Sequence, residues 1–150
     1  MDITSLTYLD LRCPLSYAKV DNITDESALF SKINANTGEN DDYLLCYNLN
    51  PAQSSSIEPE CDQFLCSLVF IGRKTRQEEE NEVVLPAGNY LFNQCRADIF
   101  MNKEEWLDIA VEQQKDGLWE RRKPGNLLFI RYLREDGAFV TQVFRPVTED

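Results

Sequence analysis

Two apolar runs near the C-terminus are the most constraining feature of this chain of 150 residues. They cover residues 127–133 and 139–147, and both are rich in large apolar side chains. Asp136-Gly137 lies between them, and an Asp-Gly pair suits the tight turn that joins two antiparallel strands. The pattern therefore predicts a β-hairpin at the end of the chain.

Further strands are predicted upstream. Residues 15–23 alternate between apolar and polar side chains, and every second residue of 43–49 is tyrosine or leucine. The run at residues 64–71 is mostly apolar. Residues 90–95 follow Pro86-Ala-Gly88, where glycine allows the positive φ that a tight reversal requires. These four segments are expected to pair with the hairpin in one antiparallel sheet.

A first helix is predicted after residues 15–23. Thr24 can cap it, and the two acidic residues that follow favour the positive end of a helix. Leu29 and Ile33 are four residues apart and form a narrow apolar stripe. The Asn-Thr-Gly sequence at residues 36–38 is expected to end this helix.

A second helix is better marked. Asn102 is a plausible N-cap with Glu105 three residues later, a spacing close to that of the capping box. Trp106 begins a stripe at helical spacing that continues to Gln113. Gly117 is expected to end the helix.

The predicted elements occur twice in the order strand, helix, strand, strand. The first set covers about residues 3–75 and the second about residues 82–148, and residues 129–132 weakly repeat residues 44–47. The pattern predicts an α+β fold with a single domain over residues 1–150. Two repeats related by a pseudo-twofold axis would form a curved antiparallel sheet with two main helices. An aromatic concavity at that axis is the usual form of a small-molecule site.

The charge balance argues against nucleic acid as a direct partner. The chain has 26 acidic and 15 basic residues, so its formal charge is −11, which repels phosphate backbones and anionic lipid surfaces. The densest acidic run, residues 77–82, is interpreted as a solvated loop. No segment has the roughly 18 to 20 consecutive apolar residues that cross a bilayer, and the N-terminus has no signal-peptide pattern. We therefore expect a cytoplasmic protein without a membrane partner.

Catalytic and metal-binding patterns are missing from the sequence. Histidine, the commonest general base at neutral pH, does not occur. The five cysteines are too scattered for a zinc site, and their odd number does not suit an oxidised secreted scaffold. Cys46 and Cys66 lie in apolar runs, where a reduced thiol acts as a small hydrophobe. We expect no metal, no cofactor and no enzymatic activity.

Several motifs together resemble a known family. They are Leu85-Pro-Ala-Gly-Asn-Tyr90, a helix carrying Trp106, a strand ending at Tyr132, and Pro146-Val147 near the end of the chain. Tyr47-Asn-Leu-Asn-Pro51 is similar to the first-repeat strand and turn of the same family. In this order they resemble the gyrase-inhibitor-like (GyrI-like) small-molecule-binding domain. That family includes free-standing proteins and effector-binding domains of AraC-type and MerR-type transcription regulators.

The resemblance implies a pocket between the two repeats for amphipathic molecules, often aromatic and cationic, with a buried acid as charge partner. Ile130 and Gln142 stand where the family often has its acids. Because burying a cation without a counter-charge costs several kcal/mol, the pocket is expected to favour neutral or weakly polar ligands. The residues expected to contact the ligand are Tyr47, Tyr90, Trp106, Phe129, Ile130, Tyr132 and Gln142.

These residues also have purely structural interpretations. Trp106 suits a core anchor on an amphipathic helix, and buried tyrosines need hydrogen-bond partners whether or not a ligand is present. Gln142 is a candidate because a ligand would satisfy a buried amide that lacks partners. Alternation places Arg145 on the face of Phe139 and Val143, opposite Gln142, and an inward Arg145 would instead favour an anionic ligand.

Three function classes remain open at this level. The first is a domain that senses or sequesters a small amphipathic or aromatic molecule, linked to transcription regulation or multidrug response. If the chain is a fragment of a regulator, a DNA-binding domain would precede it. The alternatives are a small-molecule hydrolase of the same fold, which needs a general base, and a protein inhibitor of a topoisomerase whose acidic surface mimics nucleic acid.

Overall fold

The computed structural model describes residues 2–4, 6–19, 30–34, 41–51, 64–74, 83–119 and 122–149. Within them the main helix is α2 (Lys103–Trp119), and residues 30–34 form a short helical segment. The strands are β1 (Asp2–Ile3), β2 (Thr7–Leu11), β3 (Leu15–Lys19), β4 (Asp42–Pro51), β5 (Phe64–Lys74), β6 (Val83–Leu85), β7 (Gly88–Ala97), β8 (Arg122–Pro124), β9 (Leu127–Glu135) and β10 (Ala138–Glu149).

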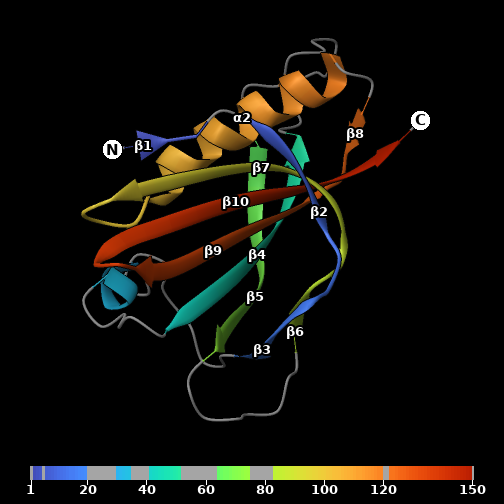
Figure 1. Cartoon of the computed structure of the whole chain (residues 1–150). Coiled ribbons are helices and arrows are strands. Elements are labelled where there is room, and N and C mark those ends of the chain that lie inside the picture. Colours follow the sequence, from blue (N-terminus) through green and yellow to red (C-terminus); the bar gives the residue numbers. More distant parts are fainter. Residues whose placement is uncertain are drawn as a thin grey trace.

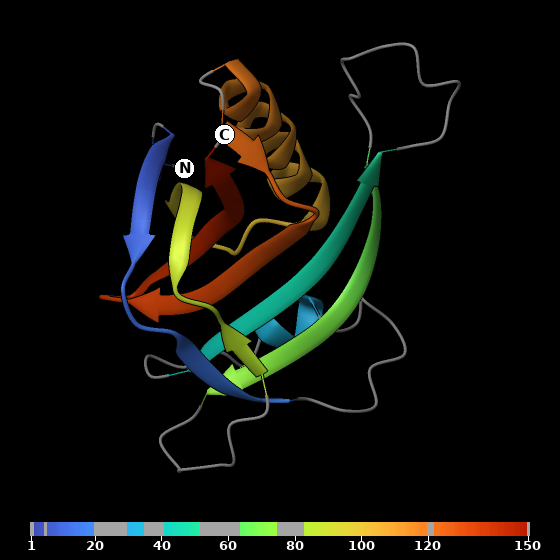
Figure 2. The same ribbon diagram turned by 90° about the vertical axis from the view of Figure 1, so that its right-hand side faces the viewer.

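The strands form one antiparallel sheet with the order β1-β7-β10-β9-β4-β5-β3-β6, and β2 and β8 pair with β7 and β10. The sheet curls strongly, as Figure 2 shows. A connection of three residues links its opposite ends, since β2 pairs with β7 and the next strand, β3, pairs with β5 and β6. The α+β class and the curved antiparallel sheet agree with the sequence-based expectation (Figure 1).

The C-terminal hairpin is confirmed. β9 and β10 pair directly, with Ala138 opposite Glu135, and the turn between them consists of Asp136 and Gly137. Both turn residues have positive φ, 50° and 81°. These angles are characteristic of the two-residue turn whose twist matches that of the flanking strands. The local turn sequence thus sets the register of the hairpin.

The start of α2 is also as predicted. Asn102 Oδ1 accepts a hydrogen bond from the backbone N–H of Glu105 at 2.9 Å, and Glu105 Oε1 accepts one from the N–H of Asn102 at 3.2 Å. This reciprocal pair is a capping box. The predicted end at Gly117 is wrong, because the helix continues to Trp119. A glycine inside a helix costs only about 1 kcal/mol relative to alanine, which does not end a helix whose hydrogen bonds continue.

Alternation along the strands divides the buried side chains between two faces of the sheet. The helix-facing cluster contains Tyr43, Leu45, Tyr47 and Leu49 of β4, all on one face as predicted, together with Trp106 of α2. The inner cluster lies on the opposite face and is built from strands alone. Its buried members are Tyr17, Leu44, Cys46, Leu85, Tyr90, Phe129 and Phe144. Both faces are therefore aromatic and apolar.

Several short strands were not predicted. β1, β2, β6 and β8 have between two and five residues each, and β2 and β6 both contain exposed side chains. They are stabilised by pairing with strands that are distant in the sequence. Thr7 of β2, for example, pairs with Phe92 of β7. A short, half-exposed strand carries too little alternation to be recognised locally.

Some predicted features lie outside the described residues. They are the cap at Thr24, the apolar position Leu29, the helix stop at residues 36–38, the acidic loop at residues 77–82, and Cys61. Of the predicted first helix, residues 30–34 are described as helical, and Ile33 is buried. Among the described residues, no helix has both the length and the apolar character needed to span a bilayer.

Free thiols are found at three described positions. Cys46 and Cys95 are buried, whereas Cys13 is exposed. Burial raises the pKa of the Cys46 thiol to about 12. A thiol with that pKa is not ionised at neutral pH, so Cys46 acts as a small core residue, as its position in an apolar run indicated.

Candidate functional site

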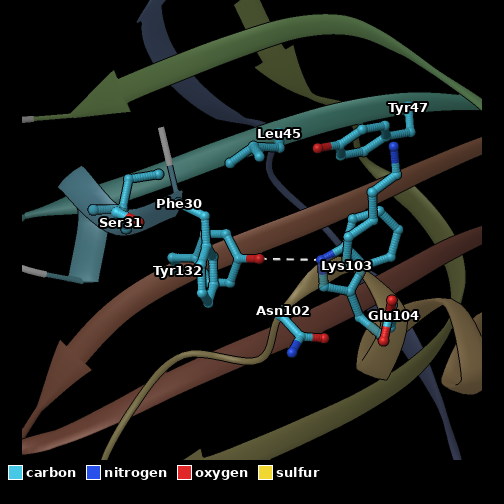
Figure 3. A pocket seen from close by; sticks show the side chains of 10 residues that line it. Phe30, Ser31, Leu45, Tyr47, Asn102, Lys103, Glu104 and Tyr132 are labelled. Carbon is cyan, nitrogen blue, oxygen red and sulfur yellow. Dashed lines mark hydrogen bonds between the residues drawn. The ribbon is translucent and has the colours of Figure 1, made fainter. Parts of the chain in front are cut away.

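The main pocket lies on the helix-facing side of the sheet, between residues 30–34 and the first turn of α2 (Figure 3). Its volume is about 450 Å³, within the range of small-molecule sites. It is lined by Phe30, Ser31, Ile33, Leu45, Tyr47, Asn102, Lys103, Glu104, Trp106 and Tyr132. β4 and β9 supply the strand residues of this lining, so the pocket covers the centre of the sheet.

The floor of the pocket is aromatic. The rings of Tyr47 and Trp106 are 4.8 Å apart, and the Phe30 ring meets Tyr132 edge-on at 6.3 Å. Tyr47, Trp106 and Tyr132 are each no more than 3% exposed. These rings come from different elements and border one space, which suits a planar apolar ligand.

A hydrogen-bond chain fixes two of these side chains. The indole Nε1 of Trp106 donates to the Tyr132 hydroxyl, and that hydroxyl donates to the backbone oxygen of Met101. Burial raises the pKa of Tyr132 above its usual value, so the hydroxyl keeps its proton. Because both donors are already used, this part of the floor offers a ligand only an acceptor lone pair and aromatic surface.

The polar groups of the pocket lie at its mouth. Ser31, Asn102 and Glu104 are exposed, whereas Lys103 is half-buried. Lys103 Nζ lies 5.4 Å from the centroid of the Tyr47 ring, a cation–π arrangement. A lysine in this position repels a second cation that approaches the same ring. The more exposed Glu104 carboxylate is better screened by water and attracts a cation less strongly.

Three of the seven residues expected to contact a ligand line this pocket: Tyr47, Trp106 and Tyr132. Ile130 belongs to the same helix-facing cluster and pairs with Leu45 across the β4·β9 ladder, but it is fully buried and is not part of the lining. The other three, Tyr90, Phe129 and Gln142, lie on the opposite face of the sheet.

Tyr90 and Phe129 are packing residues of the inner cluster. Their rings meet edge-on at 6.3 Å, and Tyr90 makes a second edge contact with Phe144 at 5.7 Å. The Tyr90 hydroxyl donates to the backbone oxygen of Pro86, and burial raises its pKa to about 12. The expected turn at Pro86 thus receives a structural hydrogen bond from the tyrosine that follows it.

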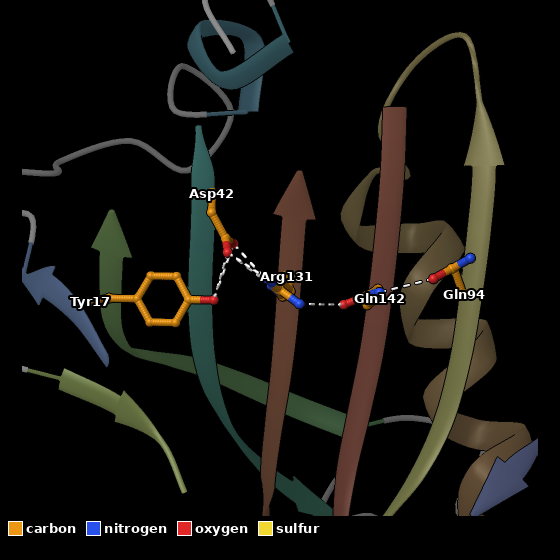
Figure 4. A network of polar contacts seen from close by, with 5 residues as sticks. All are labelled: Tyr17, Asp42, Gln94, Arg131 and Gln142. Carbon is orange, nitrogen blue, oxygen red and sulfur yellow. Dashed lines mark hydrogen bonds and ion pairs between the residues drawn. The ribbon is translucent and has the colours of Figure 1, made fainter. Parts of the chain in front are cut away.

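Gln142 belongs to a polar row on the inner face whose members come from five strands, β3, β4, β9, β10 and β7 (Figure 4). Its Oε1 accepts from Arg131 at 3.2 Å, and its Nε2 donates to Gln94 Oε1 at 2.9 Å. Arg131 donates to both carboxylate oxygens of Asp42, at 2.7 to 3.1 Å, and the Tyr17 hydroxyl donates to the same carboxylate. Protein partners therefore satisfy the Gln142 amide at both ends, and it needs no ligand.

The polar row also contains a buried acid, Asp42. Asp42 is 9% exposed and pairs with Arg131 on the inner face, so it does not reach the pocket. Burial and the Asp42 carboxylate raise the pKa of Tyr17, which keeps that hydroxyl a donor. Asp42 and Arg131 are 89 residues apart in the chain, and no local sequence pattern indicates their pairing.

Arg145 shares a face of the sheet with Phe139 and Val143, as alternation predicted, and the structure shows that this is the helix-facing side. Arg145 is 2% exposed, its Nε donates to the backbone oxygen of Gly125 at 2.6 Å, and burial lowers its pKa to about 10. It is not among the residues that line the pocket. The cation at the mouth is Lys103 instead.

Seven lining residues were missed as site residues by the sequence interpretation: Phe30, Ser31, Ile33, Leu45, Asn102, Lys103 and Glu104. A signal existed for two groups of them. Leu45 shares the face of Tyr47 through strand alternation, and residues 102–104 precede Trp106 by less than one and a half helical turns. The approach of residues 30–34 to α2 is a long-range contact without a local signal.

Among the described residues, no group of three or more histidine, cysteine, aspartate and glutamate side chains is arranged to hold a metal ion. The chain matches no protein-family model, and comparison with curated proteins gives no match.

Proposed function

We propose that this protein binds a small planar aromatic molecule in the pocket between residues 30–34 and the start of α2. The observation that carries the proposal is the convergence of Tyr47, Trp106 and Tyr132 on a space of about 450 Å³. Rigid aromatic walls with polar groups confined to the mouth suit reversible binding of an amphipathic guest. In this proposal the chain senses or sequesters the molecule, as a free-standing protein or as the effector-binding part of a transcription regulator.

The charges at the mouth favour a neutral or anionic ligand. Lys103 already occupies a face of the Tyr47 ring that would attract a ligand cation, and Lys103 is half-buried. Glu104, the acidic member of the lining, is exposed. A cationic aromatic ligand would therefore meet repulsion close to the rings and only a weak, screened attraction at the rim.

We further propose the GyrI-like arrangement of two strand-helix-strand-strand repeats. The pairing order supports it. From the outside of the sheet toward its centre, the first repeat gives β3-β5-β4 and the second gives β7-β10-β9. The two repeats meet at the β4·β9 ladder. One offset of 85 residues relates Leu45 to Ile130, which pair at the centre of that ladder, and also Tyr47 to Tyr132.

The contacts of the two helical segments support the same relation. Trp106 of α2 packs on Tyr47 in β4, and Phe30 of the first helical segment packs on Tyr132 in β9. Each segment thus contacts the tyrosine of the other proposed repeat. In this arrangement the pocket lies across the pseudo-twofold axis, which explains why matching tyrosines form its floor.

The test uses three ligands of equal shape: 2-naphthylmethanol, 2-naphthoate and 2-naphthylmethylammonium. In a Trp119→Phe background Trp106 is the sole tryptophan, since the chain has two, so its fluorescence reports on the pocket. We expect saturable fluorescence changes and a higher melting temperature with the alcohol and the carboxylate. A ligand at 100 times its Kd stabilises the fold by about 2.7 kcal/mol.

A matched pair of variants localises the binding. Ser31→Phe places a ring in the mouth, whereas Lys32→Phe adds the same ring at an exposed neighbouring residue that is not part of the lining. Binding should be lost in the first variant and kept in the second. If none of the three compounds gives saturable binding, the proposed function is wrong.

A further inference from the structure

A second pocket lies against a different face of α2. Its volume is about 420 Å³, and it is bounded by the N-terminal segment, by β7 and by the helix. Ile3, Leu6, Met101 and Ile109 supply an apolar surface. Ile3 is 48% exposed, so a ligand that covers it removes apolar surface from water. Neither the main pocket nor the polar row includes any of these residues.

The rim of this pocket is acidic. Glu105, Asp108 and Glu112 follow at intervals of three and four residues along α2, which places them on one helix face. Asp108 and Glu112 are exposed. In the described part of the chain no lysine or arginine lines the pocket. The rim therefore attracts a positively charged group.

The second, independent observation is Gln113, which lines the same pocket and is only 1% exposed. Its Nε2 donates to Asn93 Oδ1 at 3.0 Å and to the backbone oxygens of Val143 and Leu91 at 3.3 and 3.5 Å. Three acceptors around Nε2 determine the orientation of the amide, because a flipped amide would place oxygen against oxygen.

This orientation leaves Gln113 Oε1 buried without a hydrogen-bond partner. Asn93 Nδ2 donates to the backbone oxygen of Thr4 at 3.1 Å and makes no hydrogen bond to Gln113 Oε1. A buried acceptor without a partner destabilises the fold unless a donor from elsewhere reaches it. The missing group at this site is therefore an N–H or O–H donor.

We propose that the second pocket binds an organic ammonium ion, primary or secondary, that carries an apolar body. One N–H of the ligand is donated to Gln113 Oε1. Its positive charge lies beside Asp108 and Glu112, and its apolar body covers Ile3 and Ile109. This ligand class differs from the neutral or anionic aromatic class of the main pocket, so the two sites are separable by ligand charge.

The test is an NMR titration of the full chain carrying Ser31→Phe, which blocks the main pocket. The probes are 2-phenylethylammonium, its trimethylated analogue, which has no N–H, and neutral 2-phenylethanol. We expect saturable shifts of the Gln113 side-chain amide and of the α2 backbone near Asp108 with the primary ammonium. The trimethylated analogue should bind about tenfold more weakly because it has no donor for Gln113.

Variants of the rim test the charge. The double substitution Asp108→Asn with Glu112→Gln changes only exposed residues and should weaken binding of the primary ammonium about threefold to tenfold. Glu135→Gln, at an exposed carboxylate at the end of β9 that lines neither pocket, is the control and should leave binding unchanged. Binding should also weaken when NaCl is raised from about 50 to 500 mM.

Two results would overturn the proposal. One is the absence of a saturable Gln113 shift with the primary ammonium, whatever the other resonances do. The other is equal affinity for all three probes, unchanged by the rim variants, which would mean nonspecific apolar contact with a water molecule satisfying Gln113 Oε1. Neither result bears on binding of naphthyl compounds in the main pocket.

Discussion

The indole nitrogen of Trp106 donates a hydrogen bond of 3.1 Å to the hydroxyl of Tyr132. Both side chains are almost completely buried, and the same hydroxyl donates to the backbone oxygen of Met101 at 2.9 Å. One tyrosine oxygen thus ties α2 and the segment before it to β9. The contact holds the aromatic floor of the pocket in position whether or not a ligand is bound.

Tyr132→Phe should therefore lower the free energy of unfolding by about 1 to 3 kcal/mol, because it leaves the indole N–H and the Met101 oxygen buried without partners. Urea unfolding followed by circular dichroism measures the change. Tyr8→Phe, at a side chain that is 40% exposed, is the control and should change stability by less than about 0.5 kcal/mol. Equal stability of the Tyr132→Phe and parent proteins would contradict the structural role.

The pair of Asp42 and Arg131 predicts a strong non-additive effect. Arg131→Met should destabilise the fold by about 2 to 4 kcal/mol, because Asp42 stays buried and, among the described residues, keeps the Tyr17 hydroxyl at 3.1 Å as its hydrogen-bond partner. Adding Asp42→Leu should recover part of that loss, since no buried charge then remains. A double-mutant cycle from urea unfolding gives the coupling energy.

The surface pair of Arg96 and Glu135 is a matched comparison. Its closest charged atoms are 3.6 Å apart, and the side chains are 35% and 56% exposed. Glu135→Gln should change the free energy of unfolding by less than about 0.5 kcal/mol. If Arg131→Met and Glu135→Gln lowered the free energy of unfolding by similar amounts, burial would not strengthen the Asp42–Arg131 interaction.

Gly72 is expected to tolerate no side chain. A Cβ built on it would lie 2.6 Å from Tyr17 Cβ and 2.9 Å from a methyl carbon of Val83, so β3 and β6 would have to move. Gly72→Ala should cost about 1 to 3 kcal/mol of overpacking strain in a thermal or urea unfolding experiment. Gly125→Ala is the control, because its nearest contact would be 3.6 Å away, an ordinary separation. Equal effects of both substitutions would refute the tight packing at Gly72.

Stability should fall at alkaline pH. Burial raises the pKa of Cys46 from 9.0 to about 12 and that of Tyr90 from 10.0 to about 12. The unfolded chain loses these protons first, so it binds fewer protons than the folded chain above pH 9, and the free energy of unfolding decreases as pH rises. The stability is complete below pH 9 and is lost between about pH 9 and 12.

Urea midpoints at pH 8, 9, 10 and 11 measure this dependence. Cys46→Ala removes the group that titrates first in the unfolded chain, so its midpoint should fall less than that of the parent between pH 9 and 10. A midpoint that stays constant up to pH 11 would contradict the burial of these protons.

Local sequence patterns were sufficient for elements whose determinants lie within a few residues of one another. The Asp136-Gly137 turn, the capping box of Asn102 and Glu105, and the shared face of Tyr43 to Leu49 all follow from short-range chemistry. A turn needs particular backbone angles, a helix start needs a side-chain acceptor, and a strand alternates with period two.

The choice of face was beyond such patterns. Alternation separates Tyr132 from Phe129 and Gln142, but both faces of this sheet are buried and aromatic, so composition does not distinguish the pocket side from the packed side. The side is decided by where α2 and residues 30–34 cover the sheet. In the same way, the sequence alone indicated that the Gln142 amide would lack partners, whereas in the structure Arg131 and Gln94 from neighbouring strands satisfy it.

The division has a single physical reason. Periodicity, turn chemistry and capping depend on interactions between residues that are close in the sequence, so the order of the amino acids is sufficient to predict them. The pocket floor and the Asp42–Arg131 pair depend on contacts between residues that are far apart in the chain. Asp42 and Arg131 are separated by 89 positions. Such contacts come into existence when strands pair and the sheet curls, and burial then assigns each side chain to packing, to the polar row or to the pocket.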